Sequence, residues 1–149
     1  MAIAGPPMEI MLIEDNAGDV RLTVEALKEA RVANRLHVAR DGVEALRMLK
    51  APGAATPRPD LILLDLNLPR KDGREVLTEI KQDDGLRHIP VVILSTSQAE
   101  QDILHSYRLG ANAFITKPVE IDQFFEAMRS LEQFWLTRQL RDGQPELLQ

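Results

Sequence analysis

Four apolar runs of this sequence each end in side chains that can carry a charge or donate a hydrogen bond. In chain order, these side chains are Glu14-Asp15, Asp65, Ser95-Thr96-Ser97 and Thr116-Lys117. If they were brought to one place, they could hold a hard divalent cation such as Mg²⁺ together with a phosphoryl group. Whether they meet depends on the elements that carry them.

The carboxylates restrict the chemistry of such a site. Carboxylates held close together repel, and at least one keeps its proton unless a cation neutralises the cluster. Mg²⁺ would do so, because it prefers oxygen ligands and its coordination is often completed by a phosphate. Lys117 and Ser95 could hold the remaining oxygens of a phosphoryl group. An aspartate can accept such a group covalently, so Asp65 is the candidate acceptor of an aspartyl-phosphate site.

Each of these residues also has an ordinary structural explanation. A carboxylate at a strand end is usually a solvated loop residue, and Asp15 or Asn16 could cap a helix. Lys117-Pro118 could simply begin a helix, and Ser95 could be a hydroxyl satisfied at the end of a strand. Polar side chains of the right types at the ends of four predicted strands nevertheless favour a functional site.

The apolar pattern predicts five strand–helix units. The predicted strands are Met8–Ile13, Leu36–Ala39, Leu61–Leu64, Val91–Leu94 and Ala113–Thr116. The predicted helices are Ala17–Ala30, one that begins at Asp41-Gly42, Glu75–Lys81, Gln98–Leu109, and Val119 to about Arg141. Such alternation, with continuously apolar strands, is typical of a parallel sheet covered by helices on both faces. Ligands bind at the carboxyl edge of such sheets, where these polar residues lie.

Composition narrows the class of protein. The chain has 149 residues, 44% of them hydrophobic, which suits one soluble domain, and it lacks cysteine, which excludes disulfides and thiolate sites. A formal net charge of -5 argues against a nucleic-acid partner. We find no stretch of about 20 apolar residues for a membrane span and no secretory signal, so we expect a cytoplasmic protein. We expect a tail at 1–7, the domain at 8–141 and a tail at 142–149.

Over about residues 8–131, the sequence closely resembles the receiver domain of bacterial response regulators. The matching motifs are Glu14-Asp15-Asn16, Asp65 within Leu61–Pro69, Asp72-Gly73, Val91–Ser97, and Gly110-Ala111 followed by Lys117-Pro118. The resemblance implies a flavodoxin-like, doubly wound α/β fold. Its five parallel strands would lie in the order 2-1-3-4-5, with five helices, and the last helix of this chain would be extended.

The resemblance also implies how a phosphoryl group is received. Asp65 would accept it from a histidine kinase, with Mg²⁺ as the cofactor. Asp65 and Asp15 would bind the metal directly, Glu14 would bind it through water, and Asn67 would bind it through its main-chain carbonyl.

Further residues would bind the phosphoryl group or respond to it. Ser95, in place of the commoner threonine, and Lys117 would contact its oxygens, and Lys117 would precede Pro118 by a cis peptide bond. Thr96 would line the route to the phosphoryl group, where it could slow dephosphorylation. The ring of Phe114 would move inward on activation, although plain core packing also explains this residue.

A narrower resemblance is to the single-domain regulators that partner bacterial phytochrome kinases. It rests on Ser95-Thr96-Ser97, Tyr107, Gly110-Ala111-Asn112 and Phe134-Trp135-Leu136. It implies that the phosphoryl donor is a light-regulated histidine kinase.

The final helix predicts self-association. Phe134, Trp135 and Leu136 are consecutive and cover most of the circumference of a helix, so one protomer cannot easily bury all three. We expect a homodimer through the fourth and fifth helices and the fifth strand, with Ile103 and Tyr107 as further contacts.

Three other functions fit the sequence less well. A Mg²⁺ phosphohydrolase with an aspartyl nucleophile would carry an Asp-x-Asp motif, in which the second Asp is the general acid. Here Asn67 occupies that second position. A degenerate receiver that acts as a constitutive binding module would need to have lost Asp65, Asp15 or Lys117. A flavin-binding protein would need a Ser/Thr-rich phosphate loop after the first strand. We therefore expect a signalling switch that catalyses its own phosphoryl uptake and loss and turns over no external substrate.

Overall fold

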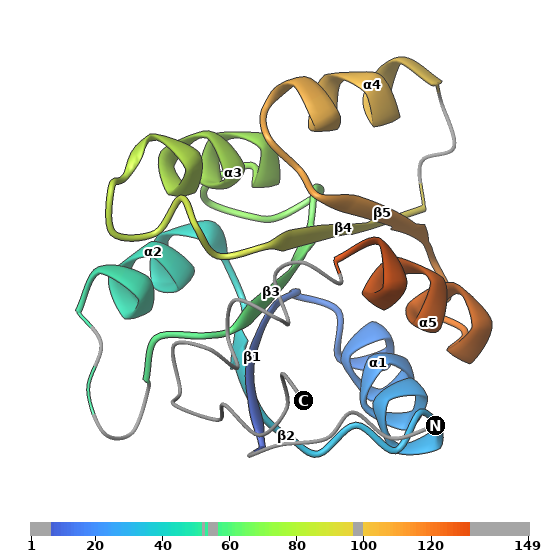
Figure 1. Cartoon of the computed structure of the whole chain (residues 1–149). Helices are drawn as coiled ribbons and strands as arrows, with labels where there is room; N and C mark the ends of the chain where they lie inside the picture. The colour runs from blue at the N-terminus through green and yellow to red at the C-terminus, as the bar shows by residue number, and fades with distance from the viewer. Residues whose placement is uncertain (1–6, 52, 54–56, 97–99, 132–149) are drawn as a thin grey trace, which may run out of the picture.

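The five predicted strands form one parallel sheet in the computed structural model, which describes residues 7–51, 53, 57–96 and 100–131. The strands are β1 (Met8–Ile13), β2 (Asn34–Ala39), β3 (Leu61–Asp65), β4 (Val91–Ser95) and β5 (Ala113–Thr116). Their order across the sheet is β2-β1-β3-β4-β5, and every neighbouring pair is parallel (Figure 1). This confirms the flavodoxin-like order that the family resemblance implies.

The helices that follow the strands cover both faces of the sheet (Figure 1). They are α1 (Ala17–Glu29), α2 (Gly42–Lys50), α3 (Gly73–Gln82), α4 (Glu100–Arg108) and α5 (Ile121–Ser130). Residues of α1 and α5 pack in one apolar cluster, and residues of α2 and α3 pack in another across the sheet. Leu109, directly after α4, packs against the second cluster. No helix in the described ranges is both long and apolar enough to cross a membrane.

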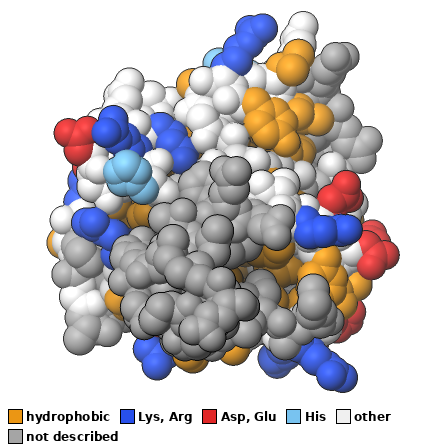
Figure 2. All heavy atoms as spheres, in the orientation of Figure 1, with side chains coloured by type: hydrophobic (Ala, Val, Ile, Leu, Met, Phe, Trp, Pro, Cys, Tyr) orange, Lys and Arg blue, Asp and Glu red, His pale blue; other side chains and the backbone are white. Residues whose placement is uncertain are grey.

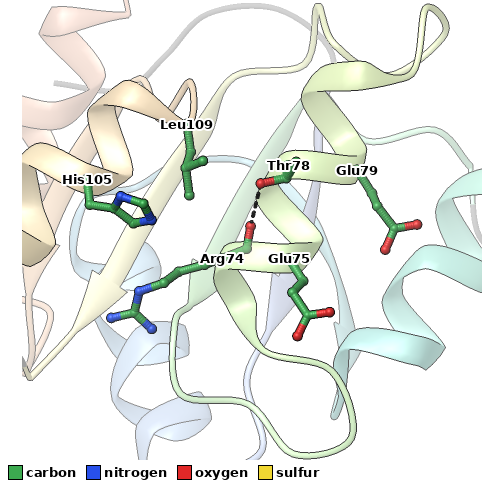
Figure 3. Close-up of a pocket in the computed structure, with 6 residues that line it drawn as sticks. All are labelled: Arg74, Glu75, Thr78, Glu79, His105 and Leu109. Atoms are coloured by element: carbon green, nitrogen blue, oxygen red, sulfur yellow. Dashed lines mark hydrogen bonds between the residues drawn. The ribbon is translucent and has the colours of Figure 1, made fainter.

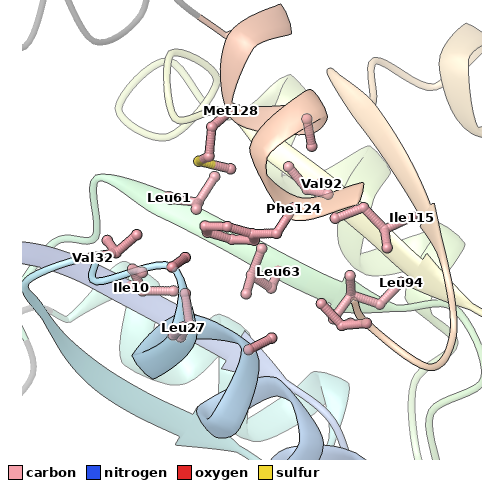
Figure 4. Close-up of a cluster of buried hydrophobic side chains, with 14 of the residues drawn as sticks. Ile10, Leu27, Val32, Leu61, Leu63, Val92, Leu94, Ile115, Phe124 and Met128 are labelled. Atoms are coloured by element: carbon pink, nitrogen blue, oxygen red, sulfur yellow. The ribbon is translucent and has the colours of Figure 1, made fainter. Parts of the chain in front are cut away.

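The two clusters explain why the strands are continuously apolar. Leu61 and Leu63 point into the first cluster, whereas Ile62 and Leu64 point into the second. All four are buried, because each face of β3 is covered. Figure 4 shows the first cluster, where the ring of Phe124 from α5 lies among side chains of the central strands. A rigid core of this kind fixes the carboxyl ends of the strands relative to one another.

Side-chain caps determine where the first three helices begin. Asn16, Asp41 and Asp72 each accept a hydrogen bond from a backbone N–H in the first turn of α1, α2 and α3. Because Asp72 is the cap, α3 begins at Gly73, two residues before the predicted start at Glu75. The end of α4 is marked by Gly110, whose φ of 108° favours glycine.

The last helix starts later than predicted. Val119 precedes the N-cap Glu120, and it is buried in the same cluster as Phe124, at the fourth position of α5. Val119 and Phe124 have the spacing of a hydrophobic staple. The N-cap Glu120 has an extended backbone, so the helix begins at Ile121 rather than at Val119. The described helix ends at Ser130, so the predicted continuation to Arg141, with Phe134, Trp135 and Leu136, lies outside the described residues.

Candidate functional site

Three of the predicted carboxylates meet at the carboxyl edge of the sheet. Glu14 and Asp15 follow β1, and Asp65 ends the neighbouring strand β3. One oxygen from each carboxylate lies within 4.8 Å of the others. Glu14 and Asp65 are buried, and Asp15 is exposed to solvent. The parallel register of β1 and β3 therefore produces an acidic cluster with one open side.

Lys117 reaches into this cluster from the end of β5. Its ammonium nitrogen Nζ lies 3.2 Å from Oδ2 of Asp65 and 2.9 Å from Oδ2 of Asp19, and it also contacts Oε1 of Glu14. The Lys117 backbone N–H donates to the carbonyl oxygen of Ser95 at 2.9 Å, which ties this residue to the end of β4. The Lys117–Pro118 peptide bond is cis. The ammonium is thus nearly enclosed, with 8% of the side chain exposed.

Burial and charge shift two pKa values at this site. Burial raises the pKa of the Glu14 carboxyl to about 7; the contact with Lys117 opposes this rise, and the neighbouring Asp65 adds to it. Burial alone would lower the pKa of Lys117. Its contacts with Glu14, Asp19 and Asp65 outweigh that effect and hold the pKa above its ordinary value. The single ammonium of Lys117 therefore does not neutralise all the carboxylates around it.

These donors suit a hard divalent cation. The set consists of carboxylate oxygens without sulfur or imidazole, which is typical of Mg²⁺ or Mn²⁺ sites rather than zinc sites. Asp15 and Asp65 could bind such an ion directly, and the open side at Asp15 leaves room for water ligands. The Glu14 oxygen Oε2 accepts the backbone N–H of Asn16 at 3.3 Å, and Oδ1 of Asp65 accepts that of Asn67 at 3.1 Å.

The loop after Asp65 is held by close backbone contacts. The N–H of Gly73 donates to the carbonyl oxygen of Leu66 at 2.9 Å. A Cβ atom at Gly73 would lie 2.4 Å from the carbonyl oxygen of Asp65, so only glycine fits without displacing the strand end. Arg70 has a positive φ of 67° and pairs with Asp41 at 3.1 Å. The start of α3 therefore packs directly on the backbone of the candidate acceptor.

Asp19 also belongs to this site, although none of the sequence motifs points to it. Asp19 lies in the first turn of α1, three residues after the N-cap Asn16 and four residues after Asp15. It is therefore close in sequence to a predicted metal ligand. That spacing was a usable signal, but an acidic residue in a first turn is also the ordinary choice for helix stability.

The remaining predicted residues lie around the end of β4 and along β5. Ser95 is fully buried at the end of β4, and Thr96 is exposed. Phe114 is partly buried and lines a cavity of about 340 Å³ with Tyr107, between α4, β5 and α5. Ile103 is partly buried on α4.

A second hollow lies between α3 and α4, and none of the clustered carboxylates lines it (Figure 3). Its volume is about 350 Å³, and its lining residues are Arg74, Glu75, Thr78, Glu79, His105 and Leu109. The Thr78 hydroxyl donates to the carbonyl oxygen of Arg74 at 2.9 Å, within α3. The chemistry predicted from the sequence therefore belongs to the carboxyl edge of the sheet and not to this groove.

Comparison with known proteins agrees with this geometry. Residues 10–129 match the family described as "Response regulator receiver domain". The response regulator Rcp1 of Synechocystis sp. is 47% identical over 135 residues, which cover 89% of this chain and 92% of Rcp1. A solved structure of the Mn²⁺-bound form of Rcp1 has a TM-score of 0.70, with 47% identity over 87% of this chain and 95% of that chain.

Two further solved structures are similar over nearly their whole length. The bacteriophytochrome response regulator AtBRR has a TM-score of 0.77 and 49% identity, covering 86% of this chain and 94% of that chain. The phosphorylated cyanobacterial phytochrome response regulator RcpA has a TM-score of 0.71 and 50% identity, covering 89% and 96%. The strand order, the acidic cluster beside Lys117 and these likenesses agree, and the chain belongs to the response regulator receiver domain family.

Proposed function

We propose that this chain is a single-domain response regulator, in which Asp65 accepts a phosphoryl group from a histidine kinase in a Mg²⁺-dependent reaction. The observation that carries the proposal is the site itself. Asp65 belongs to a group of three carboxylates that could hold a metal ion, and the Lys117 ammonium lies 3.2 Å from its Oδ2. The near-complete coverage of Rcp1, at 92%, supports a regulator that consists of the receiver alone.

Phosphoryl transfer to Asp65 needs positioning and charge neutralisation more than it needs an acid or a base. An Asp65 oxygen attacks the phosphorus of the donor phosphohistidine. The new O–P bond forms as the P–N bond breaks, and the electron pair stays on the imidazole nitrogen, which takes up a proton. Mg²⁺, when bound, would offset the charge of the carboxylates and of the phosphoryl oxygens. Lys117 would pair with a phosphoryl oxygen, since its ammonium already lies beside Asp65.

Phosphorylation would then change the populations of two conformations. The phosphoryl group adds negative charge at the end of β3, and the Ser95 hydroxyl, at the end of the neighbouring β4, would bond to it. Phe114 would repack into the cavity that it lines beside Tyr107, altering the surface formed by α4 and β5. Thr96 is exposed directly after Ser95, and we propose that it hinders the water that removes the group.

The donor we propose is a light-regulated kinase of the phytochrome type. AtBRR is a bacteriophytochrome response regulator and RcpA is a cyanobacterial phytochrome response regulator, and each is at least 49% identical to this chain. The test is phosphotransfer from a radiolabelled phytochrome kinase to this chain, beside an unrelated histidine kinase at equal concentration. Rapid transfer from the phytochrome kinase supports the assignment. Faster transfer from the unrelated kinase would contradict the assignment of the donor, and no uptake from either kinase or from acetyl phosphate would contradict the proposed acceptor.

The affinity for Mg²⁺ should fall as the pH is lowered below about 7. Glu14 has a raised pKa of about 7, so at lower pH its proton must leave before the carboxylate can help to hold the ion. Metal binding should therefore weaken by up to about tenfold per pH unit below that value and level off above it. Titration calorimetry with Mg²⁺ between pH 5.5 and 8.5 measures the effect.

The matched variant for this pH dependence is Glu14→Gln, which has no carboxyl group to titrate at that position. Its Mg²⁺ affinity should be weaker than that of the wild type and nearly flat around pH 7. An equally steep dependence in the variant would mean that a group other than Glu14 sets the profile.

We further propose that the protein forms a homodimer through α4, β5 and α5. Tyr107 is 46% exposed and Leu104 is 48% exposed, and Figure 2 shows hydrophobic side chains at the surface where α4 lies. Ile103 is on the same helix. Phe134, Trp135 and Leu136 would extend this surface, although they lie outside the described residues.

Light scattering on Tyr107→Asp tests the dimer, because a charge at the centre of an apolar contact should shift the mass from dimer to monomer. Leu22→Asp is the control, since Leu22 is an equally exposed apolar residue, at 47%, on α1. The control should remain dimeric. A monomeric wild type, or a dimer that only Leu22→Asp dissociates, would contradict the proposed interface.

A further inference from the structure

The Lys117 ammonium lies against three carboxylates, and one of them is outside the group spaced for a metal ion. Glu14 and Asp65 belong to that group, together with Asp15. Asp19 does not, although its Oδ2 lies only 2.9 Å from Nζ of Lys117. We propose that Asp19 is a positioning residue, which holds the Lys117 ammonium beside Asp65 and thereby speeds phosphoryl uptake. The inference rests on the proposed function of Asp65 as acceptor.

The backbone of Asp19 is fixed independently of its carboxylate. Its N–H donates to Oδ1 of the N-cap Asn16 at 2.9 Å, and its carbonyl oxygen accepts the Thr23 hydroxyl at 2.9 Å. The side chain is thus presented from a rigid first turn of α1, and it is 30% exposed. Removing the carboxylate should leave the start of the helix intact.

Lys117 needs such an anchor because its own side chain is flexible. A lysine side chain has four rotatable bonds, so ordering it costs conformational entropy. Glu14 and Asp65 hold the ammonium in the metal-free protein, but their charge would be shared with the cation once Mg²⁺ is bound. Asp19 would then be the carboxylate partner, among the described residues, whose charge stays available to Lys117.

The three carboxylates also lie at different distances from Nζ of Lys117. Lys117 Nζ contacts Glu14 and lies 2.9 Å from Asp19, whereas Asp65 is 3.2 Å away. Asp19 is therefore among the nearest partners of the ammonium. Without its carboxylate, Lys117 should be less well ordered beside Asp65, and phosphoryl uptake should be slower.

The first measurement is the rate of phosphoryl uptake from acetyl phosphate at saturating Mg²⁺, followed by intact mass. Asp19→Ala should be slowed by roughly three- to tenfold, the size expected for a partly exposed, charge-assisted hydrogen bond. Asp19→Asn should fall between Asp19→Ala and the wild type, because its carboxamide oxygen can still accept from the ammonium. Glu25→Ala is the control on the same helix, where Glu25 is exposed and pairs only loosely with Lys28 at 4.0 Å.

The second measurement separates positioning of Lys117 from a general structural effect. In the protein labelled with ¹⁵N-lysine and saturated with Mg²⁺, the Lys117 ammonium should give an ordered NMR signal, identified by its loss in Lys117→Met. Asp19→Ala should broaden or abolish that signal, and Glu25→Ala should preserve it. Slower uptake with an unchanged ammonium signal would overturn the inference, because Asp19 would then act by another route.

The two proposals fail in different ways. A wild-type protein that gains a phosphoryl group, with Asp19→Ala gaining it at the same rate, overturns the role of Asp19 alone. A wild-type protein that gains none, from acetyl phosphate and from kinases alike, overturns the proposed acceptor and this inference with it.

Discussion

Replacing Asp65 by asparagine should abolish phosphoryl uptake. With Mg²⁺ and acetyl phosphate, the wild type should gain the mass of one phosphoryl group, and Asp65→Asn should gain none. The reason is chemical: a neutral carboxamide is a poor nucleophile toward phosphorus and cannot form the acyl phosphate. The variant should still fold, because its carboxamide oxygen can accept the Asn67 N–H that Oδ1 of Asp65 accepts at 3.1 Å.

A matched control rules out a general effect of charge. Asp84→Asn removes a carboxylate whose side chain is 93% exposed, and it should gain the phosphoryl group at the wild-type rate. If Asp65→Asn still gained one phosphoryl group, the acceptor would be another residue, and peptide mapping would identify it. Circular dichroism spectra of all three proteins should agree, which would show that lost uptake does not reflect lost structure.

The position of this site could be predicted from the sequence because strand ends in a parallel sheet are easy to recognise. Leu61–Leu64 is apolar at every position, since β3 is covered on both faces, so the first charged residue after it marks the edge of the sheet. The same reasoning places Glu14 after β1 and Lys117 after β5. Pairing of these strands in one sheet then brings the side chains together without any further information.

The role of Asp19 could not be predicted in the same way. Its contact with Lys117 joins residues 98 positions apart, and it depends on how α1 packs beside the end of β5. In the sequence, an acidic residue in the first turn of a helix has the same pattern whether its side chain faces solvent or a buried lysine. The prediction that the last helix begins at Val119 is also wrong, because Val119 continues the apolar periodicity although the N-cap Glu120 is still extended.

Replacing Gly73 by alanine should damage both the fold and the site. Gly73 is buried at the first position of α3, and a Cβ atom there would lie 2.4 Å from the Asp65 carbonyl oxygen and 2.6 Å from Cα of Leu66. Both atoms belong to the backbone and cannot rotate away, so the end of β3 must shift. We expect the free energy of unfolding to fall by about 2 kcal/mol or more, measured by urea denaturation.

The functional effect of Gly73→Ala should exceed what the loss of stability explains. The displaced atoms include the backbone of the acceptor itself, so the Asp65 carboxylate would move relative to Lys117 and the metal ligands. A misplacement of even about 1 Å at a reacting group can cost roughly 100-fold in rate. Phosphoryl uptake should therefore be strongly slowed at a temperature where the variant is still folded.

Gly53→Ala is the matched control, because a Cβ atom at Gly53 would meet no atom of the described residues within 4 Å. It makes the same chemical change in the same chain, and both unfolding and uptake should stay near their wild-type values. If Gly73→Ala were destabilised but took up phosphoryl normally, the strand end would have relaxed without moving the carboxylate. In that case the packing of α3 on Asp65 would serve the stability of the sheet rather than the geometry of the acceptor.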